Sequence, residues 1–142
     1  MTISILFPHG GTAPLKHPYP RTGLEAKFSA PYCAAAAWHD GRISLATFSD
    51  ETSNRPSLAG TMTAVSVRER GGPHEPLGSA PVEVTVAGRD WKDHIVVDWA
   101  PGSLQDPLSD EELLDKWFDC ATHGGLPSPN GSATALLHSE HD

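Results

Sequence analysis

Basic residues are scarce in this sequence, and long apolar runs are absent from it. Ten Lys and Arg residues stand against eighteen Asp and Glu residues, which gives a formal net charge of −8. Binding to a nucleic-acid backbone needs a concentrated basic surface, so nucleic acid is excluded as the expected partner. No apolar stretch approaches the ~20 residues of a membrane-spanning helix, and no basic segment near Met1 indicates a signal peptide. The sequence therefore predicts a cytoplasmic protein with neither a nucleic-acid nor a membrane partner.

Cysteine is rare as well. Cys33 and Cys120 both fall inside predicted helices among apolar neighbours, which predicts buried free thiols. Two cysteines are too few to hold an iron–sulfur cluster. Among the eight histidines, His138 and His141 have helical spacing but no third ligand nearby. Because no phosphate-binding glycine loop, dinucleotide fingerprint or nucleophile elbow is present either, we expect no metal and no cofactor.

The 142 residues are enough for one domain with its own core. Alternating apolar residues predict strands at 2–7, 62–68, 82–86 and 95–99, the last two forming a hairpin around residues 88–90. Helical spacing and turn signals predict helices at 29–41, 43–48, 55–61 and 109–123, with an irregular loop at 12–24 and a surface loop at 71–81.

Two of these helices carry explicit boundary signals. Ser29 is a suitable N-cap, Pro31 is tolerated in the first turn, and Gly41 supplies a left-handed stop. Ser109 and Glu112 form the S-x-x-E capping box of the last helix.

The order of these elements predicts the fold class. Strands cluster in the middle of the chain, with helices on either side of the cluster. This arrangement is typical of an α+β two-layer sandwich, with helices on one face of a mostly antiparallel four-stranded sheet. We expect this domain to occupy residues 1–125, followed by a short tail or terminal helix at 126–142.

Tyr32 is the residue that chemistry alone singles out. A phenol in the first turn of a helix lies in positive potential, which favours its phenolate and an anionic ligand. Lys16, Arg21 and Lys27 precede it closely in the sequence and could add further positive charge. The alternative interpretation is that Tyr32 packs in the core with its hydroxyl hydrogen-bonded.

The stretch around Tyr32 also carries a resemblance to a known family. Residues 17–37 read HPYPRTGLEAKFSAPYCAAAA, and three further segments follow in the same order, at 48–56, 82–86 and 107–116. Together these segments resemble the second domain of the MmgE/PrpD family, which includes 2-methylcitrate dehydratase, cis-aconitate decarboxylase and iminodisuccinate epimerase. The resemblance covers roughly residues 2–125. Family enzymes are about three times as long, and the 142 residues contain no counterpart of their first, all-helical domain.

The resemblance implies an α+β domain that closes over an active site for small di- or tricarboxylates. It implies lyase or epimerase chemistry without a metal or other cofactor, with Tyr32 as the catalytic residue. The residues predicted to bind substrate are Arg21, Lys27, Ser29 and His17. The expected partner is a helical first-domain subunit, or other copies of the chain.

Two further interpretations remain open at this point. The chain could be a carboxylate-binding or protein-interaction domain that kept the fold without the chemistry. It could also form a dimer that buries the surface meant for a helical partner, in which case a monomer would expose an apolar patch.

Overall fold

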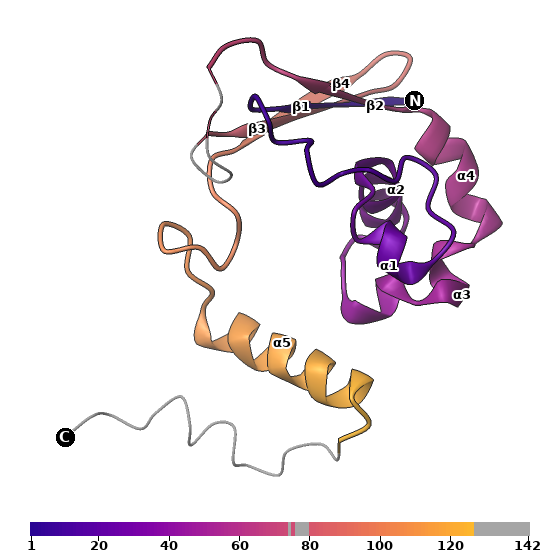
Figure 1. Cartoon of the computed structure of the whole chain (residues 1–142), viewed down its shortest axis with the longest axis vertical. Coiled ribbons are helices and arrows are strands. Elements are labelled where there is room, and N and C mark those ends of the chain that lie inside the picture. The colour runs from indigo at the N-terminus through magenta and orange to yellow at the C-terminus, as the bar shows by residue number, and fades with distance from the viewer. Residues whose placement is uncertain (74, 76–79, 127–142) are drawn as a thin grey trace. The chain divides into compact units, whose positions relative to one another are not determined.

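The structure is a computed structural model, and it describes residues 1–73, 75 and 80–126. The chain divides into two compact units, residues 1–100 and 101–142, which we describe separately (Figure 1). Most of the predicted tail at 126–142 and part of the predicted loop at 71–81 lie outside the described residues. His138 and His141 are among them.

The first unit is built on an open, four-stranded sheet. Its strands are β1 (Thr2–Phe7), β2 (Val65–Glu69), β3 (Val82–Ala87) and β4 (Lys92–Val97), arranged in the order β2-β1-β3-β4. β1 pairs parallel with β2 and antiparallel with β3, and β3 and β4 form an antiparallel hairpin. The predicted α+β class and mostly antiparallel sheet are confirmed. The parallel pair makes the sheet mixed, because the chain returns to β2 through a helical crossover.

Every helix that the structure describes in the first unit lies in the crossover between β1 and β2. They are α1 (Gly23–Ala26), α2 (Ala30–Asp40), η1 (Leu45–Phe48), α3 (Asp50–Ser53) and α4 (Pro56–Thr63). α2 has the predicted limits, because Ser29 accepts a hydrogen bond from the backbone N–H of Tyr32 and Gly41 has φ of 70°. Both cap predictions are therefore confirmed.

α2 contributes to two apolar clusters. Ala30 packs with Ile3 and Ile5 of β1, against the valines of β2 and β3. In the second cluster, Tyr32 of α2 packs with Leu58 of α4 and with several alanines. Alanine side chains allow neighbouring elements to approach the helix closely, so α2 joins the sheet to the rest of the crossover.

Two predicted strand limits were wrong. The strand predicted at 62–68 begins at Val65, because α4 continues through Met62 and Thr63 to its last turn at Ala64. The strand predicted to reach Trp99 ends at Val97. Val97 pairs with Val82, the first residue of β3, so no residue of β3 remains to pair beyond it.

The second unit contains α5 (Asp110–His123). Its capping box is confirmed: the Glu112 carboxylate accepts a hydrogen bond from the backbone N–H of Ser109 at 2.8 Å, and the Ser109 hydroxyl accepts one from the backbone N–H of Glu112 at 3.3 Å. Cys120 on this helix is exposed, and Cys33 on α2 is only partly buried. The prediction of a buried thiol was therefore wrong for Cys120, because the described residues leave its side chain exposed.

No helix in the described part of the chain combines the length and the apolar character needed to cross a bilayer.

Glu69, at the end of β2, anchors the loop that leaves β1. Its carboxylate accepts hydrogen bonds from the backbone N–H groups of Gly10 and Thr12 at 3.1 and 2.9 Å, and from the Thr12 hydroxyl. These donors favour the charged carboxylate and lower the pKa of Glu69 from 4.5 to about 2. The loop at 12–24 is therefore tied to the sheet at its first residues.

We expect Glu69→Gln to lower the free energy of unfolding near neutral pH, because an amide replaces the charged acceptor. The folded pKa lies below the unfolded one, so the contribution of Glu69 is complete above about 4.5 and disappears as pH falls toward about 2. Urea unfolding of both proteins across this range should show their difference shrinking in acid. A difference that stays constant would show that the loop is not held by the charge.

Candidate functional site

The stretch predicted to carry the site folds into a compact turn around α1. Thr22 caps this helix by accepting from the backbone N–H of Glu25 at 3.2 Å. The Glu25 carboxylate in turn accepts from the backbone N–H of Arg21 at 2.7 Å. Together these two bonds fix the turn that leads into α1.

A long-range contact then fixes this turn against η1 and α3. A Cβ built on Gly23 would overlap the backbone carbonyl of Phe48, so only glycine fits there. The backbone N–H of Gly23 donates to Asp50 at 2.7 Å, and the side-chain amide of Asn54 donates to the carbonyl oxygen of Arg21 at 3.1 Å. We call these contacts the Gly23–Asp50 junction.

Two acidic residues of this region accept hydrogen bonds from backbone groups, whereas its cations are exposed. Glu25 and Asp50 each accept from a backbone N–H, as described above. The side chains of Arg21 and Lys27 are exposed, and neither makes an ion pair within the described residues. The Lys27 ammonium lies 6.0 Å from the centre of the Phe48 ring, at the edge of the range for a cation–π contact. The loop therefore presents positive charge to solvent from a fixed backbone.

Tyr32 lies beneath this surface. Its side chain is 0% exposed, and its hydroxyl donates to the backbone carbonyl of Thr47. Its ring is tilted against that of Phe48 at 6.2 Å between centroids. Burial raises the pKa of the Tyr32 phenol, with nearby Arg55 acting weakly in the opposite direction. The position in the first turn of a helix was expected to favour the phenolate. The loss of solvent around the phenol oxygen outweighs that effect and raises the pKa.

The remaining two predicted site residues have structural contacts. Ser29 is buried, with 1% of its surface exposed, and its hydroxyl caps α2. His17 is partly buried, and its backbone N–H donates to the carbonyl oxygen of Phe28 at 3.3 Å. The structure thus places Arg21 and Lys27 on an exposed turn. It places Ser29 and Tyr32 in the interior and leaves His17 partly exposed.

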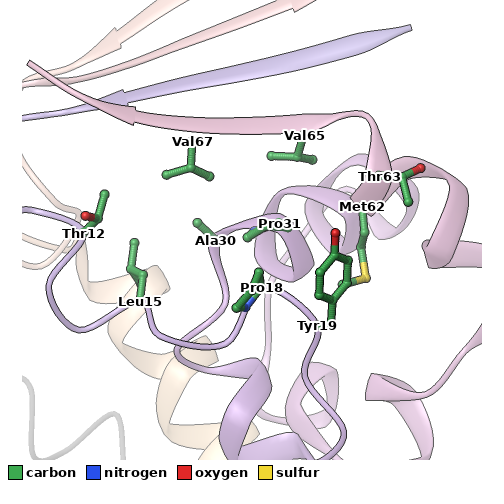
Figure 2. A pocket seen from close by; sticks show the side chains of 10 residues that line it. All are labelled: Thr12, Leu15, Pro18, Tyr19, Ala30, Pro31, Met62, Thr63, Val65 and Val67. Atoms are coloured by element: carbon green, nitrogen blue, oxygen red, sulfur yellow. The ribbon is translucent and has the colours of Figure 1, made fainter.

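A cavity of about 240 Å³ lies between the same loop and the edge of the sheet. Figure 2 shows Val65 and Val67 reaching from β2 toward Leu15 and Pro18 of the loop, while the ring of Tyr19 stands beside Met62. Apolar side chains and the hydroxyl-bearing side chains of Thr12, Tyr19 and Thr63 both contribute to its walls. The full lining consists of Thr12, Leu15, Pro18, Tyr19, Ala30, Pro31, Met62, Thr63, Val65 and Val67.

None of the five predicted site residues lines this cavity. Sequence analysis missed the hydroxyls of Thr12, Tyr19 and Thr63. Tyr19 had a partial signal, because it lies between two prolines in the quoted stretch, but the sequence does not show that it lines a cavity. Thr12 and Thr63 had none, since they line the same cavity only because β1 pairs with β2. Among the described residues, no group of three His, Cys, Asp or Glu side chains could hold a metal ion.

These features define a small α+β domain with a cationic turn held by the Gly23–Asp50 junction and a small cavity of mixed polar and apolar lining. The chain matches the MmgE/PrpD C-terminal domain over residues 2–131, and it belongs to that family. The resemblance expected from the sequence is thereby confirmed. A comparison with curated proteins found no match.

We expect Gly23→Ala to destabilise the protein by roughly 2 kcal/mol or more, because the added methyl group would force Phe48 away from the turn. Gly60→Ala is the matched control. Gly60 lies in α4 with open space around it, so alanine there should be neutral or stabilising by up to about 1 kcal/mol. Thermal and urea unfolding of both variants measure the contrast. Equal effects at the two positions would show that the Gly23–Asp50 junction is not tightly packed.

Proposed function

We propose that this chain provides one wall of an active site for small di- or tricarboxylates. The reaction is of the lyase or epimerase kind found in the MmgE/PrpD family, and it uses an all-helical first domain or subunit as the other wall. The observation that carries the proposal is the pair of exposed cations, Arg21 and Lys27, on a backbone fixed by the Gly23–Asp50 junction. Family membership supplies the chemical class.

Removing a proton beside a carboxylate builds negative charge on the substrate, and fixed positive groups stabilise that charge without having to reorganise. Arg21 and Lys27 suit this role because the carboxylates of Glu25 and Asp50 are already bonded to backbone N–H groups. Guanidinium and ammonium groups also bind carboxylates in the ground state through charge-assisted hydrogen bonds. The proton-transferring acid and base would come from the helical wall, and the metal-independent course of the reaction follows from the family resemblance.

Tyr32 enters this proposal as an anchor of the wall. Its buried hydroxyl, already donating to Thr47, supports a role in holding η1 against α2. Proton donation to a substrate would require the 45–48 turn to move aside.

This same observation favours a second candidate function. A domain whose tyrosine is closed off in the core could bind carboxylates, or another protein, without taking part in catalysis.

Arg21→Gln and Lys27→Gln should each weaken substrate binding about tenfold or more, the value of one hydrogen bond to a charged group. The measurement is turnover of 2-methylcitrate, cis-aconitate or iminodisuccinate by the chain combined with a helical MmgE/PrpD first domain. Arg42→Gln is the control, since Arg42 is an exposed cation that follows α2 and lies outside the site. Equal behaviour of all three variants would contradict the assignment, and binding without any turnover would favour the second candidate function.

Tyr32→Phe separates anchoring from proton transfer. An anchor should lose about 1–3 kcal/mol of stability, because the carbonyl of Thr47 is left without its donor, while kcat of the combined protein changes only a few-fold. A proton donor should instead lose about 10²–10⁴ in kcat. Measuring unfolding and kcat on the same preparations decides between them, and a large fall in kcat at unchanged stability would overturn the anchoring role.

A further inference from the structure

The outer edge of β4 is the most exposed apolar feature of the sheet. β4 stands at the end of the strand order, and no strand within the described residues pairs with its outer edge. Ile95, Val96 and Val97 are 54%, 47% and 40% exposed. Because neighbouring side chains on a strand point to opposite faces, these three residues make the strand apolar on both faces. Edges of this kind are ready templates for pairing with another strand.

The hairpin geometry identifies which backbone groups of β4 point outward. The N–H of Gly88 donates to the carbonyl oxygen of Trp91 at 2.9 Å, so the backbone of Trp91 faces β3. Backbone groups alternate in direction along an antiparallel strand. Ile95, which is paired with Val84, therefore also faces β3, together with residues 93 and 97. The outward backbone groups belong to the even-numbered residues 92, 94, 96 and, one step beyond β4, 98.

We infer that two copies of this chain pair through β4, antiparallel, about a twofold axis at Ile95. In this register the outward-facing residues meet one another, as a hydrogen-bonded antiparallel ladder requires. Lys92 lies opposite Asp98 of the second copy, and the twofold axis repeats this pair at the other end of the interface. Ile95 meets its own counterpart at the axis, and Val96 lies opposite His94.

Charge complementarity favours this register over those centred on residues 93 and 94. Moving the axis to residue 94 would place Asp98 opposite Asp90, and moving it to residue 93 would place Asp93 opposite its own counterpart. Like charges directly opposite each other destabilise strand pairs, whereas the Lys92–Asp98 pair is attractive. Within the described residues, neither Lys92 nor Asp98 has an ion-pair partner in its own chain. This inference does not rest on the proposed function, because it uses only the sheet edge.

Charge reversal tests the pairing and its register together. Lys92→Asp and Asp98→Lys should each weaken dimerisation about tenfold, since two symmetric attractions become repulsions, and the double variant should restore it. Arg89→Asp is the control for Lys92→Asp, because it makes the same change in charge at the hairpin turn, outside the paired strand. Sedimentation equilibrium of the full chain, over a concentration series, measures each dissociation constant.

A proline substitution tests the backbone separately. Val96→Pro removes an outward-facing N–H and leaves the hydrogen bonds to β3 in place, a position where edge strands accept proline. It should abolish the dimer while circular dichroism and the melting transition stay close to those of the unchanged chain.

Three results would overturn the inference. One is a chain that stays monomeric at every concentration, and another is a dimer insensitive to Lys92→Asp, Asp98→Lys and Val96→Pro. The third is a monomer in which the amides of His94 and Val96 resist hydrogen exchange, since another segment of the same chain would then cover the edge. If the Val96→Pro variant fails to fold, the charge-reversal series still decides the question.

Discussion

The junction of Gly23 with Phe48 and Asp50 is the contact on which the rest of the crossover depends. Two segments separated by twenty-seven residues approach so closely that no side chain fits between them, and one carboxylate bonds the backbone of the other segment. Everything exposed on the turn is oriented by this contact. Arg21 and Lys27 are long, flexible side chains, and only a fixed backbone can confine their charges to one part of the surface.

Tyr32 holds the residue that precedes the junction's Phe48 in place. Its hydroxyl satisfies the carbonyl of Thr47, one residue from the Phe48 backbone that Gly23 contacts. The same helix faces the sheet through Ala30, so the turn, the tyrosine and the first strand form one continuous packed assembly. A buried polar group with its partner in place is stabilising, and one without it is costly, which is why a single hydroxyl has such influence here.

Features decided by neighbouring residues were predicted better than features decided by long-range contacts. The limits of α2 and α5 follow from Ser29, Gly41, Ser109 and Glu112, because capping is decided by residues a few positions apart. The limit between α4 and β2 was misplaced, since Met62 fits a helix and a strand equally well until β1 selects the register. The candidate site was harder still. Sequence spacing put Tyr32 in the first turn of a helix, but only packing decides that its hydroxyl points inward.

The position of β1 in the sheet has a consequence for how the chain folds. β1 comes first in the sequence yet lies between β2 and β3, and both of its pairings join residues more than sixty positions apart. The β3–β4 hairpin, in contrast, closes over a few residues. Non-local pairings cost more loop-closure entropy and form more slowly. During synthesis, the apolar side chains of β1 must therefore wait for the crossover and the hairpin, and this interval is when the nascent chain is most open to misassembly.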